Sequence, residues 1–162
     1  IGPTLARRFG RLDIVVGNAG ALGELSPMPH IEAADWKNVI DVNLNANWRL
    51  IRTTEPLLRR SDSGRAVYVT SGADRFNRQF CGGYAVSKAA LEMMITCWAA
   101  ENESTNIKIS LIDPGATRTA MRKIAYPGED PKSVKPPEDV TDTFLDLCSP
   151  DCTRHGDRVQ IY

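Results

Sequence analysis

The chain has 162 residues, enough for a single domain with a hydrophobic core. Hydrophobic residues make up 42% of it and charged residues 25%, the composition of an ordinary globular protein. The 20 basic residues balance 20 acidic ones, so neither nucleic acid nor an anionic membrane surface is expected as a partner. No apolar run approaches the ~20 residues of a membrane helix, and no signal peptide opens the sequence.

Glycines, turns and charged residues mark the ends of the first predicted helices and strands. Residues 3–10 are typical of the last turns of a helix that ends at a glycine. Residues 13–16 predict a short buried strand, followed by a turn at 17–20. Residues 32–60 predict a helix with acidic residues early and arginines at its end, as the helix dipole favours. We expect a break near 43–47, where three asparagines compete with helical hydrogen bonds.

Strands and helices alternate through the rest of the chain. This alternation predicts parallel strands with right-handed crossovers, and hence a single domain over 1–162 with a doubly wound parallel α/β sheet. Ligands bind such a sheet beyond the carboxyl ends of its strands, so functional residues should follow strands. The remaining elements are a strand at 66–71, a helix at 83–101, a strand at 107–113, a loop at 127–137, a helix at 138–148 and a strand at 157–162.

The four cysteines, Cys81, Cys97, Cys148 and Cys152, are scattered along the sequence. This spacing indicates free thiols in a reducing cytoplasm. Cys148, Cys152 and the nearby His155 raise the alternative of a metal site, but a fourth ligand and a second ligand pair are missing. We therefore expect a cytoplasmic protein without a metal centre.

Tyr84 and Lys88 lie four residues apart on the predicted helix at 83–101, so their side chains share one face. A free tyrosine, with a pKa of about 10, is a poor acid–base catalyst at neutral pH. A neighbouring ammonium group favours the phenolate, so we expect Lys88 to lower the pKa of Tyr84. The alternative interpretation is a solvated pair on a helix surface.

Two polar residues are positioned in the sequence to assist this tyrosine. Ser71 ends the strand before the helix, where its hydroxyl can bind a substrate carbonyl oxygen while Tyr84 delivers a proton. The alternative is a serine that completes a turn. Asn43 lies at the predicted helix break, where it can hold a water that connects Lys88 to solvent. The alternative is a residue that only makes the helix irregular.

Together these residues resemble the short-chain dehydrogenase/reductase family over nearly the whole chain. In that family an Asn-Ala-Gly turn, an Asn-Ser-Tyr-Lys tetrad and a Pro-Gly-x-x-x-Thr segment follow one another in this order. Collinear matches to all of them are not expected by chance. The matching residues are Asn18-Ala19-Gly20, then Asn43, Ser71, Tyr84 and Lys88, then the segment from Pro114 to Thr119.

The resemblance implies a Rossmann-like fold and an oxidoreductase that transfers a hydride between NAD or NADP and a small-molecule carbonyl or secondary alcohol. Tyr84 would donate the proton in the reducing direction, and Ser71 would position and polarise the carbonyl. Lys88 would bind the nicotinamide ribose, and Asn43 would maintain a proton relay. The residues implied in cofactor binding are Asn18, Ala19, Gly20, Tyr84, Lys88, Pro114, Gly115, Thr117 and Thr119.

The sequence departs from the family pattern in two places. Gly17 stands where the family usually has an asparagine, and we expect a local loosening there. The Gly-rich turn that binds the pyrophosphate is absent, as is the residue that separates NAD from NADP. We therefore expect an N-terminally truncated domain, about three strands or roughly 60–80 residues short. Such a chain alone would have negligible turnover, and its strand at 13–16 would present an unpaired edge unless something else covers it.

The helix at 83–101 is apolar around almost its whole circumference, so it needs a partner on the side away from the sheet. The family pairs this helix and the one at about 46–60 across a dimer axis, which implies a homodimer or homotetramer. The alternative is cover by a helix of the same chain. An alternative function is that of a non-catalytic domain that kept the fold for assembly or regulation.

The substrate pocket is predicted from position in the sequence. Residues 74–82 and the segment after Thr119 should line it. Arginines there suggest either an anionic substrate or ordinary surface charge, and aromatic residues suggest an apolar wall. The arginines are Arg75, Arg78, Arg118 and Arg122, and the aromatic residues are Phe76, Phe80 and Tyr126.

Overall fold

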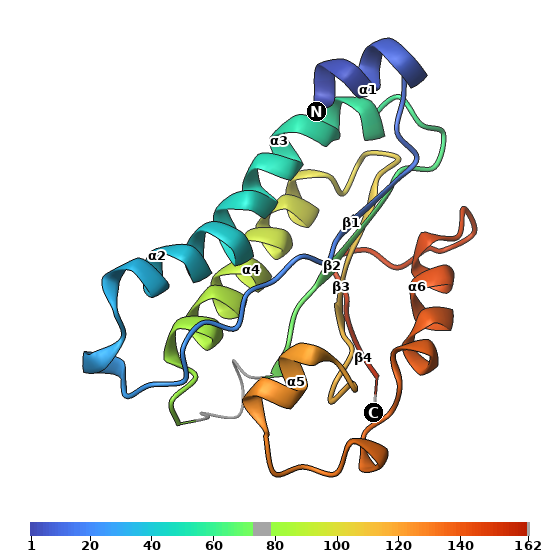
Figure 1. Cartoon of the computed structure of the whole chain (residues 1–162). Coiled ribbons are helices and arrows are strands. Elements are labelled where there is room, and N and C mark those ends of the chain that lie inside the picture. The colour runs from blue at the N-terminus through green and yellow to red at the C-terminus, as the bar shows by residue number, and fades with distance from the viewer. Residues whose placement is uncertain (73–78, 162) are drawn as a thin grey trace.

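The computed structural model of the chain describes residues 1–72 and 79–161. Within these residues, four parallel strands form one sheet in the order β1-β2-β3-β4 (Figure 1). Helices connect the strands, so the predicted parallel α/β sheet is confirmed. The strands are β1 (Ile14–Gly17), β2 (Arg65–Val69), β3 (Lys108–Asp113) and β4 (Arg158–Gln160). The α-helices are α1 (Gly2–Phe9), α2 (Ala33–Ile40), α3 (Ala46–Leu58), α4 (Gly82–Glu101), α5 (Ala120–Ala125) and α6 (Thr141–Cys148).

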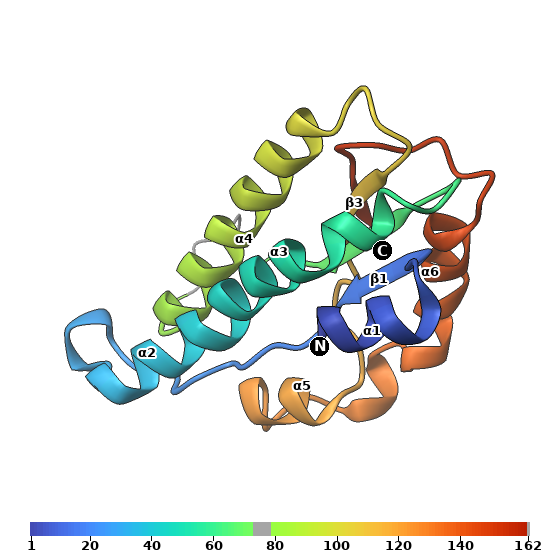
Figure 2. The ribbon, with the colours of Figure 1, turned by 90° about the horizontal axis from the view of Figure 1, so that it is seen from above.

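Helices cover both faces of the sheet, as the doubly wound arrangement requires (Figures 1 and 2). On one face, α3 and α4 pack against the strands, and Tyr68 of β2 meets Trp98 of α4. On the other face, Leu147 of α6 packs against Val67 and Ile112. All five residues of β2 are buried, because this strand has a helix layer on each side. Burial of each large apolar side chain contributes about 1.5–3 kcal/mol.

The crossovers into β3 and β4 run on opposite faces of the sheet. α4 joins β2 to β3 on one face, whereas α6 lies between β3 and β4 on the other. Because β2, β3 and β4 are parallel and adjacent in this order, connections on opposite faces have opposite hands. The expectation of right-handed crossovers throughout is therefore wrong for one of the two, although that hand is nearly universal.

The predicted helix at 32–60 is interrupted as expected. A π-helical turn at Asp41–Asn45 separates α2 from α3. Asn47 Nδ2 donates a hydrogen bond of 2.8 Å to the Asn43 carbonyl, so a side chain takes over part of the backbone pattern. The turn leaves the Asn43 side chain in the interior, with no exposed surface.

Gly17 is closely packed, and the expected loosening is wrong. A Cβ atom at this position would lie 2.3 Å from Tyr68 Cδ1 and 2.7 Å from Asn47 Oδ1. Both distances are too short for any side chain. The Tyr68 ring therefore fills the space beside Gly17.

Several predicted elements differ in extent from the observed ones. The strand predicted at 66–71 ends at Val69, so Ser71 lies beyond it. The helix predicted at 138–148 begins with a 3-10 turn at Pro137–Val140 before α6. The final strand is only Arg158–Gln160, and α5 was not predicted.

Strand β1 lies at the edge of the described sheet, as predicted for residues 13–16. Val15 points into the core beneath α3, whereas Ile14 and Val16 are exposed on the opposite face.

None of the described helices is both long enough and apolar enough to cross a bilayer.

His155 has a structural role between α4 and β3. Its Nδ1 accepts the Ile109 amide at 3.2 Å, and its Nε2 lies 2.9 Å from the Ala99 carbonyl. Among residues 1–72 and 79–161, no three His, Cys, Asp or Glu residues gather in a way that could hold a metal ion.

Candidate active site

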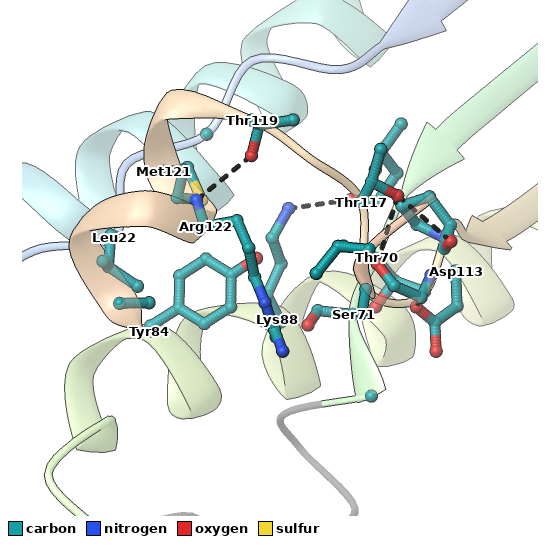
Figure 3. A pocket seen from close by; sticks show the side chains of 18 of the residues that line it. Leu22, Thr70, Ser71, Tyr84, Lys88, Asp113, Thr117, Thr119, Met121 and Arg122 are labelled. Carbon is teal, nitrogen blue, oxygen red and sulfur yellow. Dashed lines mark hydrogen bonds between the residues drawn. The ribbon is translucent and has the colours of Figure 1, made fainter. Parts of the chain in front are cut away.

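A cavity of about 920 Å³ opens beyond the carboxyl ends of β1, β2 and β3 (Figure 3). Segments that directly follow these strands line it, together with parts of α4 and α5. The cavity therefore lies where the sequence predicts a site, among residues that follow strands. Of the predicted residues, those that line the cavity are Asn18, Ala19, Gly20, Ser71, Tyr84, Lys88, Pro114, Gly115, Thr117 and Thr119.

Tyr84, Lys88 and Ser71 come together in this cavity (Figure 3). Tyr84 and Lys88 lie on one face of α4, as their spacing predicts, and Lys88 Nζ is 5.8 Å from the centre of the Tyr84 ring. Tyr84 and Ser71 share a side-chain hydrogen bond. The phenol, the ammonium group and the hydroxyl therefore converge from two elements that are separate in the sequence.

The pKa of Tyr84 is raised overall, so the expected net lowering beside Lys88 is wrong for this structure. Burial of the phenol is the main cause, and the charges of Asp113 and Cys81 act in the same direction. The hydrogen bond with Ser71 opposes them by lowering the pKa. Loss of hydration disfavours the phenolate more than its neighbours favour it, which keeps Tyr84 protonated at neutral pH.

Lys88 is almost completely buried. Its Nζ donates a 2.8 Å hydrogen bond to the Val69 carbonyl at the end of β2. Burial lowers the pKa of Lys88 to about 8, because the ammonium form loses its hydration. The Val69 carbonyl takes one of the three N–H donors, and no ion pair of Lys88 is found among the described residues.

Asn43 joins three parts of the site through its side chain. Its Oδ1 accepts the Ala21 amide at 2.7 Å, and its Nδ2 donates to the Ala21 carbonyl at 2.9 Å. The same Nδ2 donates to Ser87 Oγ at 2.9 Å. Gly20 lies close by, since a Cβ atom there would be 3.5 Å from Asn43 Oδ1 and 3.7 Å from Lys88 Nζ. Asn43 thus holds the turn after β1 against α4.

The segment after β3 forms a tight turn at the opposite side of the cavity. Gly115 has a φ of +66°, and a Cβ atom there would lie 2.6 Å from the Ile161 carbonyl oxygen. Its amide donates to Asp113 Oδ1 at 3.0 Å. Thr119 begins α5, because its Oγ1 accepts the Arg122 amide at 3.1 Å. Only glycine fits position 115, for both steric and conformational reasons.

Helix α5 and the residues after it form an outer wall of the cavity. The segment after Thr119 was predicted to line the pocket, and Met121, Arg122 and Tyr126 do so. The Arg122 guanidinium lies 3.7 Å from the centre of the Tyr126 ring and pairs with Glu129 at 2.5 and 2.7 Å. Because the charge of Arg122 is paired, the predicted anion-binding role has no support at this residue.

The other predicted pocket residues fall into two groups. Of the segment 74–82, Cys81 lines the cavity, and Phe80 lines a smaller one beside it. Arg75, Phe76 and Arg78 lie outside the described residues.

A buried ionic cluster beneath the cavity was missed. Arg158 of β4 bonds Glu92 of α4 and Asp113 of β3. The only sequence signal was the position of Glu92, four residues after Lys88 on the same helical face. Nothing in the sequence linked Arg158 to it.

Comparison with known proteins gives consistent matches. A family model described as short chain dehydrogenase matches residues 3–130. The uncharacterized oxidoreductase YciK of Escherichia coli (strain K12) is 40% identical over 150 residues, which are 93% of this chain and 59% of YciK. An uncharacterized NAD-dependent oxidoreductase of Mycobacterium tuberculosis (strain CDC 1551 / Oshkosh) is 37% identical over 115 residues, 70% of this chain and 42% of that protein.

A solved structure supports the same relationship. A short chain dehydrogenase of Shigella flexneri 2a str. 301, complexed with NADP, superposes with a TM-score of 0.93 at 36% identity. The alignment covers 98% of this chain and 66% of that one. The chain thus spans between 42% and 66% of the length of these relatives.

Proposed function

Since the chain belongs to the short-chain dehydrogenase family, we propose that it carries the catalytic residues of an NAD(P)-dependent oxidoreductase. The reaction is a reversible hydride transfer between the nicotinamide and the carbonyl or secondary alcohol carbon of a small molecule. The observation that carries this proposal is the convergence of Tyr84, Lys88 and Ser71 in one cavity at the carboxyl ends of parallel strands. The activity is proposed for the full-length protein, because the chain spans only part of its relatives.

The residues around Lys88 fit the nicotinamide side of NAD or NADP. Lys88 presents a buried ammonium group with donors to spare, as a ribose hydroxyl requires. Gly20 leaves room beside it, and the backbone from Gly115 to Thr119 lines the facing side of the cavity. A reduced nicotinamide, when bound, supplies the hydride. The relatives include both an NAD-dependent protein and one complexed with NADP, so the proposal does not choose between them.

Tyr84 acts as the proton donor in the reducing direction. Its O–H bond breaks as the proton moves to the substrate alkoxide oxygen, and a phenolate is left behind. The raised pKa of Tyr84 keeps the phenol protonated until the alkoxide forms. Lys88 is the nearby cation that stabilises the resulting phenolate. Ser71, hydrogen-bonded to Tyr84, polarises the same carbonyl oxygen.

Asn43 contributes to the proton relay through its backbone rather than its side chain. Its side chain is occupied by Ala21 and Ser87, so a water of the proton relay would bind its backbone carbonyl instead. That carbonyl accepts a hydrogen bond from the Asn47 side chain, and a carbonyl oxygen has two lone pairs, so the water would use the second one. The relay would return a proton from solvent to Tyr84 through Lys88.

A Tyr84→Phe variant of the full-length protein tests the function. Oxidation of NADPH and NADH is followed with a panel of aldehydes and ketones, and cofactor binding is measured by fluorescence titration. Tyr84→Phe should lose turnover and keep its cofactor affinity, because only the transferable proton is removed. The matched control is Tyr68→Phe, whose hydroxyl is buried without a partner among the described residues, so its loss costs no hydrogen bond. An active Tyr84→Phe enzyme contradicts the assigned donor. A native protein that binds neither cofactor favours the non-catalytic alternative.

We also propose that the protein is a homodimer or homotetramer. α3 packs beside one side of α4, and yet Val86 and Met93 of α4 remain 43% and 65% exposed. Trp48 of α3 is exposed as well. The described helices of the same chain therefore do not cover the apolar side of α3 and α4 that carries these residues. A second copy of the chain would bury it. Light scattering should give at least a dimer, and Met93→Glu should lower that mass.

A further inference from the structure

A buried ionic cluster joins β4 to the two elements beside it. Arg158 Nε donates to Glu92 Oε1 at 2.7 Å, and Arg158 Nη2 donates to Asp113 Oδ2 at 2.9 Å. The three side chains are only 12%, 14% and 3% exposed for Arg158, Glu92 and Asp113. One guanidinium group thus pairs with two carboxylates away from solvent, where such bonds are short and directional.

Each carboxylate of the cluster also holds a group next to the active site. Glu92 Oε1 accepts a 2.8 Å hydrogen bond from Thr70, the residue before Ser71. Asp113 Oδ1 accepts the amide of Gly115 in the turn that lines the cavity. Glu92 itself lies one helical turn after Lys88. The cluster therefore ties together the three backbone segments that present Ser71, Lys88 and Gly115.

We propose that Arg158 is a positioning residue of the active site, which sets the placement of Ser71 and of the Gly115 turn through Glu92 and Asp113. The proposal rests on the oxidoreductase function argued above. Arg158 does not touch the reacting atoms; it acts through its two carboxylate partners. The short strand β4 has this role in addition to completing the described sheet, since Arg158 is its first residue.

Electrostatics adds a second consequence. Within the part of the chain that the structure describes, the charged and titratable groups that act on Tyr84 are Lys88 on its own helix, Cys81 before that helix and Asp113 at the end of β3, with the Ser71 hydroxyl as hydrogen-bond partner. The Asp113 carboxylate raises the pKa of Tyr84. Arg158 offsets that carboxylate, so removal of Arg158 raises the pKa of Tyr84 further, and removal of the Asp113 charge lowers it.

The test compares Arg158→Met, Arg158→Lys and Asp113→Asn in the full-length protein, assayed for alcohol oxidation. In this direction Tyr84 accepts a proton, so the rate rises as pH passes its pKa. Arg158→Met should move the midpoint of that rise to higher pH, and Asp113→Asn should move it to lower pH. Arg158→Lys should keep the midpoint near that of the native enzyme. A general loosening of the fold would not produce shifts of opposite sign.

The kinetic constants give a second readout. Arg158→Met should lower kcat by up to about 100-fold through misplacement of the reacting groups, with little change in KM. The matched control is Arg154→Met, because Arg154 belongs to the same segment and its one ion pair with a described residue is the exposed pair with Asp157. A folded Arg158→Met enzyme with native kcat and native pH midpoint overturns the proposal. If Arg158→Met does not fold, equal midpoints for Asp113→Asn and the native enzyme overturn it instead.

A measurement without turnover separates this proposal from the proposed function. Hydrogen exchange of the Gly115 amide should be faster in Arg158→Lys than in the native protein, since the lysine cannot bind both carboxylates in the same fork. Unchanged exchange there overturns the positioning role even if the protein is an active oxidoreductase. Faster exchange in a protein that shows no turnover supports the positioning role, while the proposed function fails.

Discussion

Two parts of the cavity are stabilised in different ways. The floor consists of Ser71, Tyr84 and Lys88, with the buried Asn43 supporting it. It is held by hydrogen bonds between distant segments, such as Asn43 to Ser87 and Lys88 to Val69. In the wall, made of α5 and residues 126–129, the bonds found among the described residues join nearby positions, such as Thr119 to Arg122 and Arg122 to Glu129.

This difference separates the chemistry from the choice of substrate. A change in the floor breaks contacts with other elements, so it alters stability and the positions of the reacting groups together. We expect a change in the wall to have a more local effect, because its bonds among residues 1–72 and 79–161 link positions no more than ten apart. We therefore expect the floor to tolerate few substitutions and the wall to tolerate many.

The largest effect is expected from Lys88→Met in the floor. Loss of the ammonium group removes the cation that stabilises the Tyr84 phenolate, and kcat should fall roughly 10²- to 10⁴-fold. Lys37→Met is the matched control, because Lys37 is exposed on α2 and pairs only with Asp41 among the described residues. Steady-state kinetics give kcat for both variants, and only Lys88→Met should show the fall. A Lys88→Met enzyme with native kcat would remove Lys88 from the mechanism.

Asn43→Ala should have the next largest effect, on stability. It leaves the Ala21 amide and carbonyl without their partner at a part-buried position, which should cost about 3 kcal/mol of unfolding free energy. Asn45→Ala removes a single part-buried bond to Asp41 and should cost about 1 kcal/mol or less. Urea unfolding measures both. Equal losses for the two variants would argue against a special role for Asn43.

Lys88 should also make stability depend on pH. Its folded pKa of about 8 lies below the value of 10.5 for the exposed side chain, so the unfolded chain binds more protons between these values. Stability should therefore rise with pH in this window, by roughly 2 kcal/mol between about pH 7 and 9.5 from this group alone. To measure the contribution of Lys88, the unfolding free energies of the native protein and of Lys88→Met are determined over the same pH range and subtracted. If the unfolding free energy of both proteins changes with pH in the same way, Lys88 has the same pKa in the folded and the unfolded chain.

The smallest effect is expected in the wall. Glu129→Gln removes the charge that neutralises Arg122, so KM for substrates with a carboxylate should fall about five-fold while kcat stays near native. Arg122→Met should not show that preference, because it removes the cation itself. A panel of neutral and anionic ketones measures the change. A fall in kcat in Glu129→Gln would show that the wall also affects the positions of the reacting groups, as the floor does.

Much of the site could be predicted because its signals are local in the sequence. The spacing of Tyr84 and Lys88 specifies one face of a helix, and a serine or a Pro-Gly pair at a strand end specifies the rim of a parallel sheet. Three asparagines near 43 indicated the helix break that became the π-helical turn. These inferences depend on periodicity and on backbone hydrogen bonding, which the local sequence determines.

Other features depended on contacts between segments far apart in the chain. The raised pKa of Tyr84 results from burial, which no spacing of charges reveals. The packing of Tyr68 against Gly17 and the bonds of Arg158 to Glu92 and Asp113 join residues 45 or more positions apart. The sequence by itself determined which residues could do chemistry and on which elements they lie. Only the tertiary structure decided how those residues are buried and paired, because desolvation and pairing arise when separate elements exclude water between them.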